Sequence, residues 1–231
     1  FMARKKGKGG GKGKRAQQRA QYDELDKYPV IPPHAFARIV RDKQTLNILY
    51  QIIVPPLTKK EQEQREEIMD IFIRSLTANI EEIDADPDAY LRTALDKVIK
   101  AYGMKINKKS KSKMFYYLRR DLIGYGKMDM LMHDINVEDI SLDGTNVPIF
   151  AYHRKFESIE TTCVWETDQE LESYVIKLAQ RCGKHISVAE PLLDATLMDG
   201  SRIVMKLGRE ISTRGSVFCI RRFKDDPFSP A

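Results

Sequence analysis

Three arginines near the C-terminal end of the sequence carry the side chains best suited to contact a phosphate. Arg202 falls in an apolar, β-branched run, and Arg221 and Arg222 close the next such run. A guanidinium group presents a planar fork of donors that engages phosphate oxygens in pairs. If the two runs are strands in register, the forks could project together toward one phosphate. The alternative interpretation is ordinary surface ion pairing, and it is the one that spacing alone favours.

Motifs for complete active sites are absent from the sequence. There is no G-x-x-x-x-G-K-[ST] phosphate loop, no G-x-G-x-x-G after a strand and no nucleophile elbow. The four histidines are far apart and form no H-E-x-x-H or Cys/His cluster, so we predict no metal site. Several carboxylates lie near expected turns, where caps and Asx turns are more typical than an acid pair. These are Glu138, Asp139, Asp143, Glu190, Asp194 and Asp199.

A basic segment over residues 97–120 offers a second kind of chemistry. It contains nine lysines and arginines and no acid, with Tyr116 and Tyr117 interleaved. The basic residues are Lys97, Lys100, Lys105, Lys108, Lys109, Lys111, Lys113, Arg119 and Arg120. Such a run suits nucleic acid or an anionic membrane, but it also suits a solvated linker and helix face, because no nucleic-acid fold motif accompanies it.

Composition bounds the class of protein. A chain of 231 residues with 42% hydrophobic and 31% charged residues has enough apolar material for a core, which argues against wholesale disorder. The net charge of +6 is concentrated at the start, where residues 1–20 hold eight basic residues and no acid. We predict a disordered basic tail there. The sequence contains no apolar run long enough to span a membrane. Three cysteines without a C-x-x-C pair are typical of a reducing cytoplasm and of core positions.

The first half of the chain predicts an extended segment and then helices. Closely spaced prolines favour an extended strap with short strands over residues 21–57. The capping box from Thr58 to Glu61 opens the first of three helices in a module over residues 58–124. Asp86 and Pro87 begin the second helix and Gly103 ends it, while the third starts at about Ser112. The apolar faces contain Ile68, Phe72, Leu76, Ile80, Ile83, Leu91, Leu95, Val98, Tyr102, Met114, Leu118 and Leu122.

The second half, residues 125–223, predicts strands mixed with a single helix. A turn-rich stretch over residues 143–146 separates two short apolar runs and indicates a hairpin. A third strand follows over residues 159–165, and a capping box at Thr167 begins a helix that stops at Gly183. Residues 201–207 and 216–223 predict two further strands. The fold class is therefore α+β, with an antiparallel sheet after the three-helix module.

The sequence resembles the N-terminal region of the archaeal secretion ATPases of the type II/type IV secretion superfamily, which includes pilus-assembly and archaellum motors. The resemblance spans residues 28–231 without a missing block. It rests on blocks that include Arg120-Asp121-Leu122-Ile123-Gly124-Tyr125-Gly126, Leu178-Ala179-Gln180-Arg181-Cys182-Gly183, Pro191-Leu192-Leu193-Asp194-Ala195, Asp199-Gly200-Ser201-Arg202-Ile203 and Phe218-Cys219-Ile220-Arg221-Arg222-Phe223.

The resemblance implies a PAS-like mixed α/β domain that precedes a RecA-like motor domain in a hexameric cytoplasmic ATPase. Residues 224–231 would begin the interdomain linker, and the motor domain with its Walker motifs, ATP and Mg²⁺ would follow. Arg202 and Arg221, and less closely Arg222, match arginines that reach the γ-phosphate in the interdomain cleft. The implied partners are the motor domain, neighbouring subunits and an integral-membrane platform protein at the inner face of the cell membrane. No cofactor is expected for this chain alone.

The sequence is also compatible with two other classes of function. A stand-alone binding or adaptor module would use the basic tail and residues 97–120 on nucleic acid or anionic membrane, with strongly salt-dependent affinity. A PAS-like sensor of a small ligand is suggested by fold analogy only.

Overall fold

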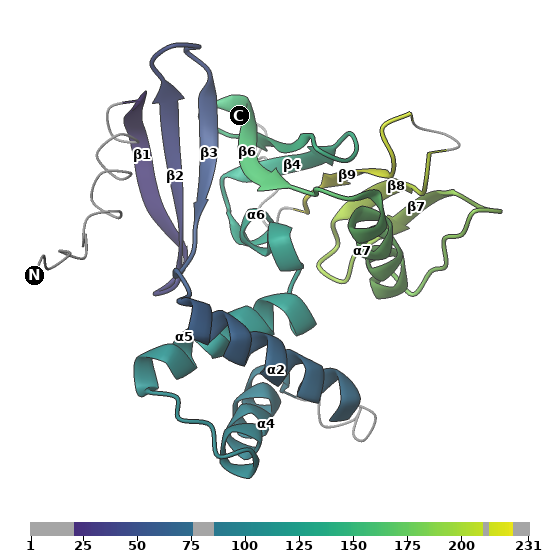
Figure 1. The fold of residues 1–231 in the computed structure, drawn as a ribbon. Helices are drawn as coiled ribbons and strands as arrows, with labels where there is room; N and C mark the ends of the chain where they lie inside the picture. The colour runs from purple at the N-terminus through teal and green to yellow at the C-terminus, as the bar shows by residue number, and fades with distance from the viewer. Residues whose placement is uncertain (1–20, 76–85, 210–212, 224–231) are drawn as a thin grey trace, which may run out of the picture. The chain divides into compact units, whose positions relative to one another are not determined.

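The computed structural model describes residues 21–75, 86–209 and 213–223 (Figure 1). The chain divides into two compact units. Of the described residues, the first unit, here called the sheet unit, comprises 21–28, 37–52, 134–209 and 213–223. The second, the helical unit, comprises 29–36, 53–75 and 86–133. The predicted basic tail (residues 1–20) and interdomain linker (residues 224–231) lie outside the described residues.

The described residues form a nine-stranded sheet in the order β1-β2-β3-β6-β5-β4-β9-β8-β7. Its strands are β1 (Tyr22–Ile31), β2 (Ala35–Asp42), β3 (Ile48–Ile53), β4 (Val137–Leu142), β5 (Pro148–His153), β6 (Glu157–Val164), β7 (Leu192–Thr196), β8 (Arg202–Lys206) and β9 (Val217–Arg221). The six strands from β6 to β7 pair antiparallel, whereas β3 runs parallel to β6. The prediction of an α+β fold with an antiparallel sheet is confirmed.

The expected hairpin is present as β4 and β5, in which Ile140 pairs with Ala151. Residues 201–207 and 216–223 contain the expected strands β8 and β9, which pair directly. The sequence pattern did not predict β7, because its run of five residues, Leu192–Thr196, contains an aspartate and a threonine and shows no clean alternation. Pro29 lies within β1, where it is tolerated because β1 is an edge strand.

Helix α7 (Asp168–Arg181) follows β6 and begins at the predicted cap, where the Thr167 hydroxyl accepts a hydrogen bond from the Glu170 amide at 3.3 Å. Its apolar side packs on the sheet: Tyr174 forms a cluster of three rings with Trp165 and Phe218, whose centroids are 4.8 and 6.1 Å from that of Tyr174. Trp165 and Phe218 are almost fully buried. One face of strands β8 and β9 is thereby covered, as Figure 1 shows for α7.

A polar network centred on Asp134 lies inside the sheet unit. The Asp134 carboxylate is 1% exposed and accepts hydrogen bonds from the hydroxyls of Tyr28 (2.7 Å) and Tyr50 (2.6 Å) and from the Asn136 amide (2.9 Å). The Tyr28 hydroxyl is also 3.0 Å from His153 Nε2. Burial raises the pKa of both tyrosines and lowers the pKa of His153. The network therefore connects β1, β3 and β5 through one buried charge.

The helical unit contains α2 (Lys59–Ser75), α4 (Pro87–Ala101) and α5 (Lys108–Leu118), followed by a π-helical turn (Arg119–Ile123), a 3-10 turn (Gly126–Met128) and α6 (Asp129–His133). The three predicted helices are confirmed, although α5 begins four residues early because Asn107 caps it by accepting from the Ser110 amide at 2.8 Å. The core of the unit consists of Ile68, Phe72, Leu91, Leu95, Met114 and Leu118. The predicted core positions Leu76, Ile80 and Ile83 lie outside the described residues.

The predicted capping box at the start of α2 is formed, and it also holds α5. The Thr58 amide donates to Glu61 (2.8 Å), and the Glu61 amide donates to the Thr58 hydroxyl (3.2 Å). The Glu61 carboxylate further accepts from the Ser110 hydroxyl at 2.7 Å and from Lys113 at 3.1 Å. Together these donors, the Thr58 amide first, lower the pKa of Glu61 to about 2.

This pKa predicts an acid-dependent loss of stability in the helical unit. A carboxyl whose pKa is depressed in the folded state stabilises it above the unfolded pKa, near 4.5 for Glu61, and loses that contribution as the pH falls toward about 2. We expect Glu61→Gln to have a lower free energy of unfolding than wild type at pH 7. Its free energy of unfolding should also fall less than that of wild type as the pH is lowered from 4.5 to about 2. Urea unfolding followed by amide resonances of α2 and α5 measures this, and parallel declines in the two proteins would contradict it.

Candidate functional site: an arginine pair on the open face of the sheet

Arg202 and Arg221 lie side by side on the sheet unit. They are directly opposed residues on the antiparallel strands β8 and β9. Both side chains are exposed, at 71% for Arg202 and 81% for Arg221. Opposed residues on neighbouring strands have Cβ atoms about 5 Å apart, within reach of a single phosphate group for two guanidinium side chains. The sheet thus places two of the three predicted arginines together on one surface.

Each of these arginines has a carboxylate partner on its outer side. Arg202 donates to Asp194 of β7 through Nε (3.1 Å) and Nη2 (2.7 Å), in a bidentate pair. Arg221 donates through Nε to Asp139 of β4 at 3.1 Å, and these two residues are opposed in the sheet. The ion pair with Arg202 lowers the pKa of Asp194. Four strands therefore present the row Asp194, Arg202, Arg221 and Asp139.

The ion pairs match the alternative interpretation drawn from spacing, but they do not occupy the arginines fully. Among the described residues, Arg221 donates a side-chain hydrogen bond through Nε alone. Its two terminal nitrogens can therefore bind another acceptor. Exposed ion pairs contribute little to stability, because solvent and salt screen them. A phosphate could therefore replace these carboxylates as the partner of the arginines. The row also neutralises the repulsion that two opposed arginines would otherwise suffer.

Arg222 does not join the pair, because it directly follows β9 and its side chain contacts backbone carbonyls instead. Its backbone amide donates to the Glu138 carbonyl at 2.9 Å. Its Nη1 donates to the Val137 carbonyl at 2.9 Å and to the Asp134 carbonyl. Burial lowers the pKa of Arg222. This arginine ties the end of β9 to the segment that leads into β4.

Three partly exposed apolar side chains lie on the same face of the sheet as the arginine pair. Val204 and Leu192 are 43% and 57% exposed, and Tyr152 is 44% exposed. Cys219 also lies on this face between the buried Phe218 and Ile220, so the prediction that all three cysteines are core residues is wrong for Cys219. Partial burial raises the pKa of its thiol, which opposes nucleophilic reactivity. We call this surface, from β7 to β5, the open face.

The carboxylates singled out in the sequence do not form an acid pair among the described residues. Asp139 and Asp194 bind separate arginines, as described above. Asp199 accepts from the Ser201 amide at 3.0 Å, which is the Asx turn expected of such a residue. Sequence reasoning missed the role of Asp139 and Asp194 as arginine partners. The sequence signal that could have indicated this role is an aspartate among the apolar residues of a short strand, as in Val137–Leu142 and Leu192–Thr196.

The basic segment over residues 97–120 lies on α4, α5 and the following turn in the helical unit. Several of its cations are paired with acids from elsewhere in that unit: Lys111 with Asp96, Lys113 with Glu61 and Arg119 with Asp88. The guanidinium of Arg120 binds Asp121 at 2.7 Å. The segment is therefore a partly neutralised helix surface rather than a continuous strip of free charge.

Other kinds of site are not found in the part of the chain that the structure describes. It contains no group of three or more histidine, cysteine, aspartate or glutamate side chains that could hold a metal ion. Within the same ranges, no helix is both long enough and apolar enough to cross a membrane.

Comparison with known proteins finds relatives in Methanocaldococcus jannaschii. The chain is 40% identical over 164 residues to the uncharacterized protein MJ1288, 31% identical over 207 residues to the uncharacterized protein MJ0900, and 32% identical over 116 residues to the uncharacterized protein MJ0781. These alignments cover 71%, 88% and 50% of this chain. They span only 65%, 36% and 15% of the relatives, so the chain corresponds to part of each.

Other comparisons add little. No protein-family model matches the chain. Among solved structures, it is similar to the VirB11 ATPase from the Brucella suis type IV secretion system, crystallised in complex with sulphate. The match has a TM-score of 0.37 and 16% identity and covers 49% of this chain and 32% of that one. A likeness at this level carries no argument about function.

Proposed function

We propose that this chain is the N-terminal regulatory and assembly region of a hexameric motor ATPase that drives secretion or the assembly of a pilus or archaellum. The observation that carries the proposal is the exposed pair Arg202 and Arg221, opposed on β8 and β9. The sequence blocks of the secretion-ATPase resemblance supply the reaction class. In this proposal, a following RecA-like motor domain holds ATP and Mg²⁺, and this chain holds neither alone.

The residues present fit a role beside a nucleotide phosphate. The two arginines are opposed on one exposed surface, and each is balanced by a carboxylate that a phosphate could replace. Bound ATP supplies the phosphoryl group, whose developing negative charge an arginine can stabilise. Arg202 and Arg221 would bind phosphate oxygens from outside the motor domain, and the apolar side chains on the same face would exclude water when the two domains close.

The proposal places the protein in the cytoplasm, at the inner face of the cell membrane. Its partners would be its own motor domain, the neighbouring subunits of a hexamer and an integral-membrane platform protein. Two relatives support the idea that such a region is joined to further domains, because the matched region makes up only 36% and 15% of their lengths. A first check is the gene beyond codon 231, which should continue in frame to a G-x-x-x-x-G-K-[ST] motif.

The decisive test uses the protein that contains both this chain and the proposed motor domain. We expect Arg202→Ala and Arg221→Ala each to lower steady-state ATP turnover at least tenfold, since arginines that contact a transferred phosphoryl group contribute about 10³ to 10⁵ in rate. Arg154→Ala is the matched control, because Arg154 is an exposed, ion-paired arginine of the sheet unit with Glu138 3.1 Å away.

A second pair of variants separates phosphate binding from ion pairing. Asp194→Asn and Asp139→Asn weaken the ion pairs but keep both arginines, so turnover should stay within about threefold of wild type if the arginines act on phosphate. Unchanged turnover in both arginine variants would overturn the proposal. Equal losses in the aspartate and arginine variants would show that the row acts only as a structural element.

A further inference from the structure

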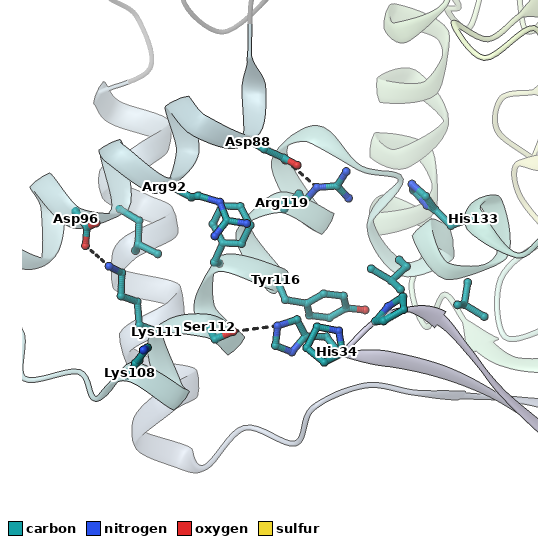
Figure 2. Close-up of a pocket in the computed structure, with 16 residues that line it drawn as sticks. His34, Asp88, Arg92, Asp96, Lys108, Lys111, Ser112, Tyr116, Arg119 and His133 are labelled. Atoms are coloured by element: carbon teal, nitrogen blue, oxygen red, sulfur yellow. Dashed lines mark hydrogen bonds and ion pairs between the residues drawn. The ribbon is translucent and has the colours of Figure 1, made fainter.

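A pocket in the helical unit collects side chains of the basic segment that the proposed function leaves unused. It has a volume of about 760 Å³, within the range of roughly 300–1,000 Å³ typical of small-molecule sites. The turn between β1 and β2 lines one side, with Pro32, Pro33 and His34, and α4 and α5 supply most of the rest (Figure 2). All of these segments belong to the same compact unit.

The charged lining of the pocket is unbalanced. Its lining includes four cationic side chains and two carboxylates: Arg92, Lys108, Lys111, Arg119, Asp88 and Asp96. The carboxylates are already engaged, Asp96 by Lys111 and Asp88 by Arg119, and both pairs are drawn in Figure 2. The lining therefore retains an excess of two positive charges, and an anion is the ligand that would neutralise them.

The two remaining cations are placed differently. The Arg92 guanidinium lies over the Phe115 ring, 4.1 Å from its centroid. This stacking fixes the plane of the guanidinium and keeps its edge donors free for an acceptor. Lys108 is exposed at the first turn of α5. Within the described ranges neither residue has a carboxylate partner, and each can therefore contribute a full charge to a ligand.

The rest of the lining suits a planar or apolar group. The rings of His34 and Tyr116 are paired, with their centroids 5.5 Å apart. A hydrogen bond of 3.0 Å between the Ser112 hydroxyl and His34 Nε2 holds the His34 ring in place. Burial lowers the pKa of His34, which favours the neutral form of its ring. Leu95 and the two prolines extend this apolar part.

We infer that this pocket binds a small organic phosphate, a phosphomonoester attached to a planar or apolar body. A phosphomonoester carries about −1.5 to −2 charge at pH 7, which matches the unbalanced lining, and its body would pack against His34 and the prolines. The site lies apart from Arg202 and Arg221, which belong to the sheet unit, so the inference does not depend on the proposed function.

The test is a titration of the 231-residue chain with 1-naphthyl phosphate, by calorimetry and by amide chemical shifts. We expect saturable binding with shifts confined to the β1–β2 turn, α4 and α5. Inorganic phosphate should bind at least tenfold more weakly because it lacks the planar body, and 1-naphthol should bind at least tenfold more weakly because it lacks the charge.

Variants locate the site. Lys108→Gln and Arg92→Gln should each weaken binding of 1-naphthyl phosphate at least threefold, and together at least tenfold. The matched control is Lys109→Gln, because Lys109 is also exposed and adjacent in sequence but does not line the pocket; its affinity should stay within twofold. Arg92 packs on Phe115, so the fold of Arg92→Gln is checked by thermal unfolding. If Arg92→Gln does not fold, the result for Lys108→Gln alone tests the inference.

Two outcomes would overturn the inference. One is the absence of saturable binding up to about 10 mM probe, which corresponds to a negligible affinity. The other is equal weakening by Lys109→Gln and Lys108→Gln together with salt-sensitive binding of a DNA duplex or anionic vesicles. That result would assign the basic segment to a diffuse polyanion surface. Neither result would bear on ATP turnover in the Arg202 and Arg221 variants.

Discussion

Replacing Asp134 by alanine is expected to lower the free energy of unfolding of the sheet unit by about 3–4 kcal/mol. The substitution removes a carboxylate that is 1% exposed and accepts from Tyr28, Tyr50 and the Asn136 amide. The Tyr50 side chain is fully buried, so its hydroxyl would lose its partner without gaining water. A buried donor left without an acceptor costs about 1–3 kcal/mol.

Urea unfolding followed by tryptophan fluorescence measures this effect. Trp165 is the single tryptophan of the sequence and is buried in the sheet unit, so its emission reports on that unit. Tyr50→Phe is the matched control, because it removes one donor and leaves the carboxylate with its other two. We expect about 1–2 kcal/mol for that variant. A loss below about 1 kcal/mol for Asp134→Ala would show that the network contributes little to stability.

The second large effect is expected at Gly144, in the turn between β4 and β5. Its φ angle is +122°, a value that residues with a side chain rarely adopt. A Cβ atom there would lie 2.2 Å from the Arg214 carbonyl oxygen, which accepts a hydrogen bond from the Thr145 amide at 2.9 Å. Gly144→Ala must therefore shift the backbone of one segment or the other, and we expect a loss of about 3 kcal/mol.

Gly208 provides the control for this prediction. Its φ angle is +79°, but a Cβ atom added there would have no heavy atom within 4 Å, so Gly208→Ala introduces backbone strain without a clash. We expect about 1 kcal/mol for that variant in the same fluorescence assay. Equal losses at the two glycines would mean that strain alone, and not the contact with Arg214, determines the effect at Gly144.

Local sequence patterns predicted most of the individual elements. The capping boxes at Thr58 and Thr167 marked the starts of α2 and α7, because a cap is a contact between residues three apart. The start of α5 was placed too late, since the Asn107 cap lies in a lysine-rich stretch without apolar periodicity. Strand β7 was missed because Leu192–Thr196 contains an aspartate and a threonine and does not alternate cleanly. Helix α6 was missed because Asp129–His133 makes little more than one helical turn.

The candidate arginine site was predictable only in part. Their residue type made Arg202 and Arg221 candidate phosphate contacts, and the resemblance to secretion ATPases selected them, whereas spacing alone favoured surface ion pairing. The succession of two expected strands made their proximity plausible. Their direct opposition follows from the register of β8 and β9. Arg222 does not join them, because it directly follows β9 and its side chain contacts backbone carbonyls instead.

The α+β class, the helix caps and the apolar faces of the helices could be predicted from the sequence, because all of them depend on residues within a few positions of one another. Three other features required the folded chain: Asp139 and Asp194 flank the arginine pair, Asp134 joins Tyr28 to Tyr50, and the β1–β2 turn closes a pocket over α4 and α5. These contacts join segments up to 106 residues apart. Their formation depends on strand order and packing, which no local pattern encodes.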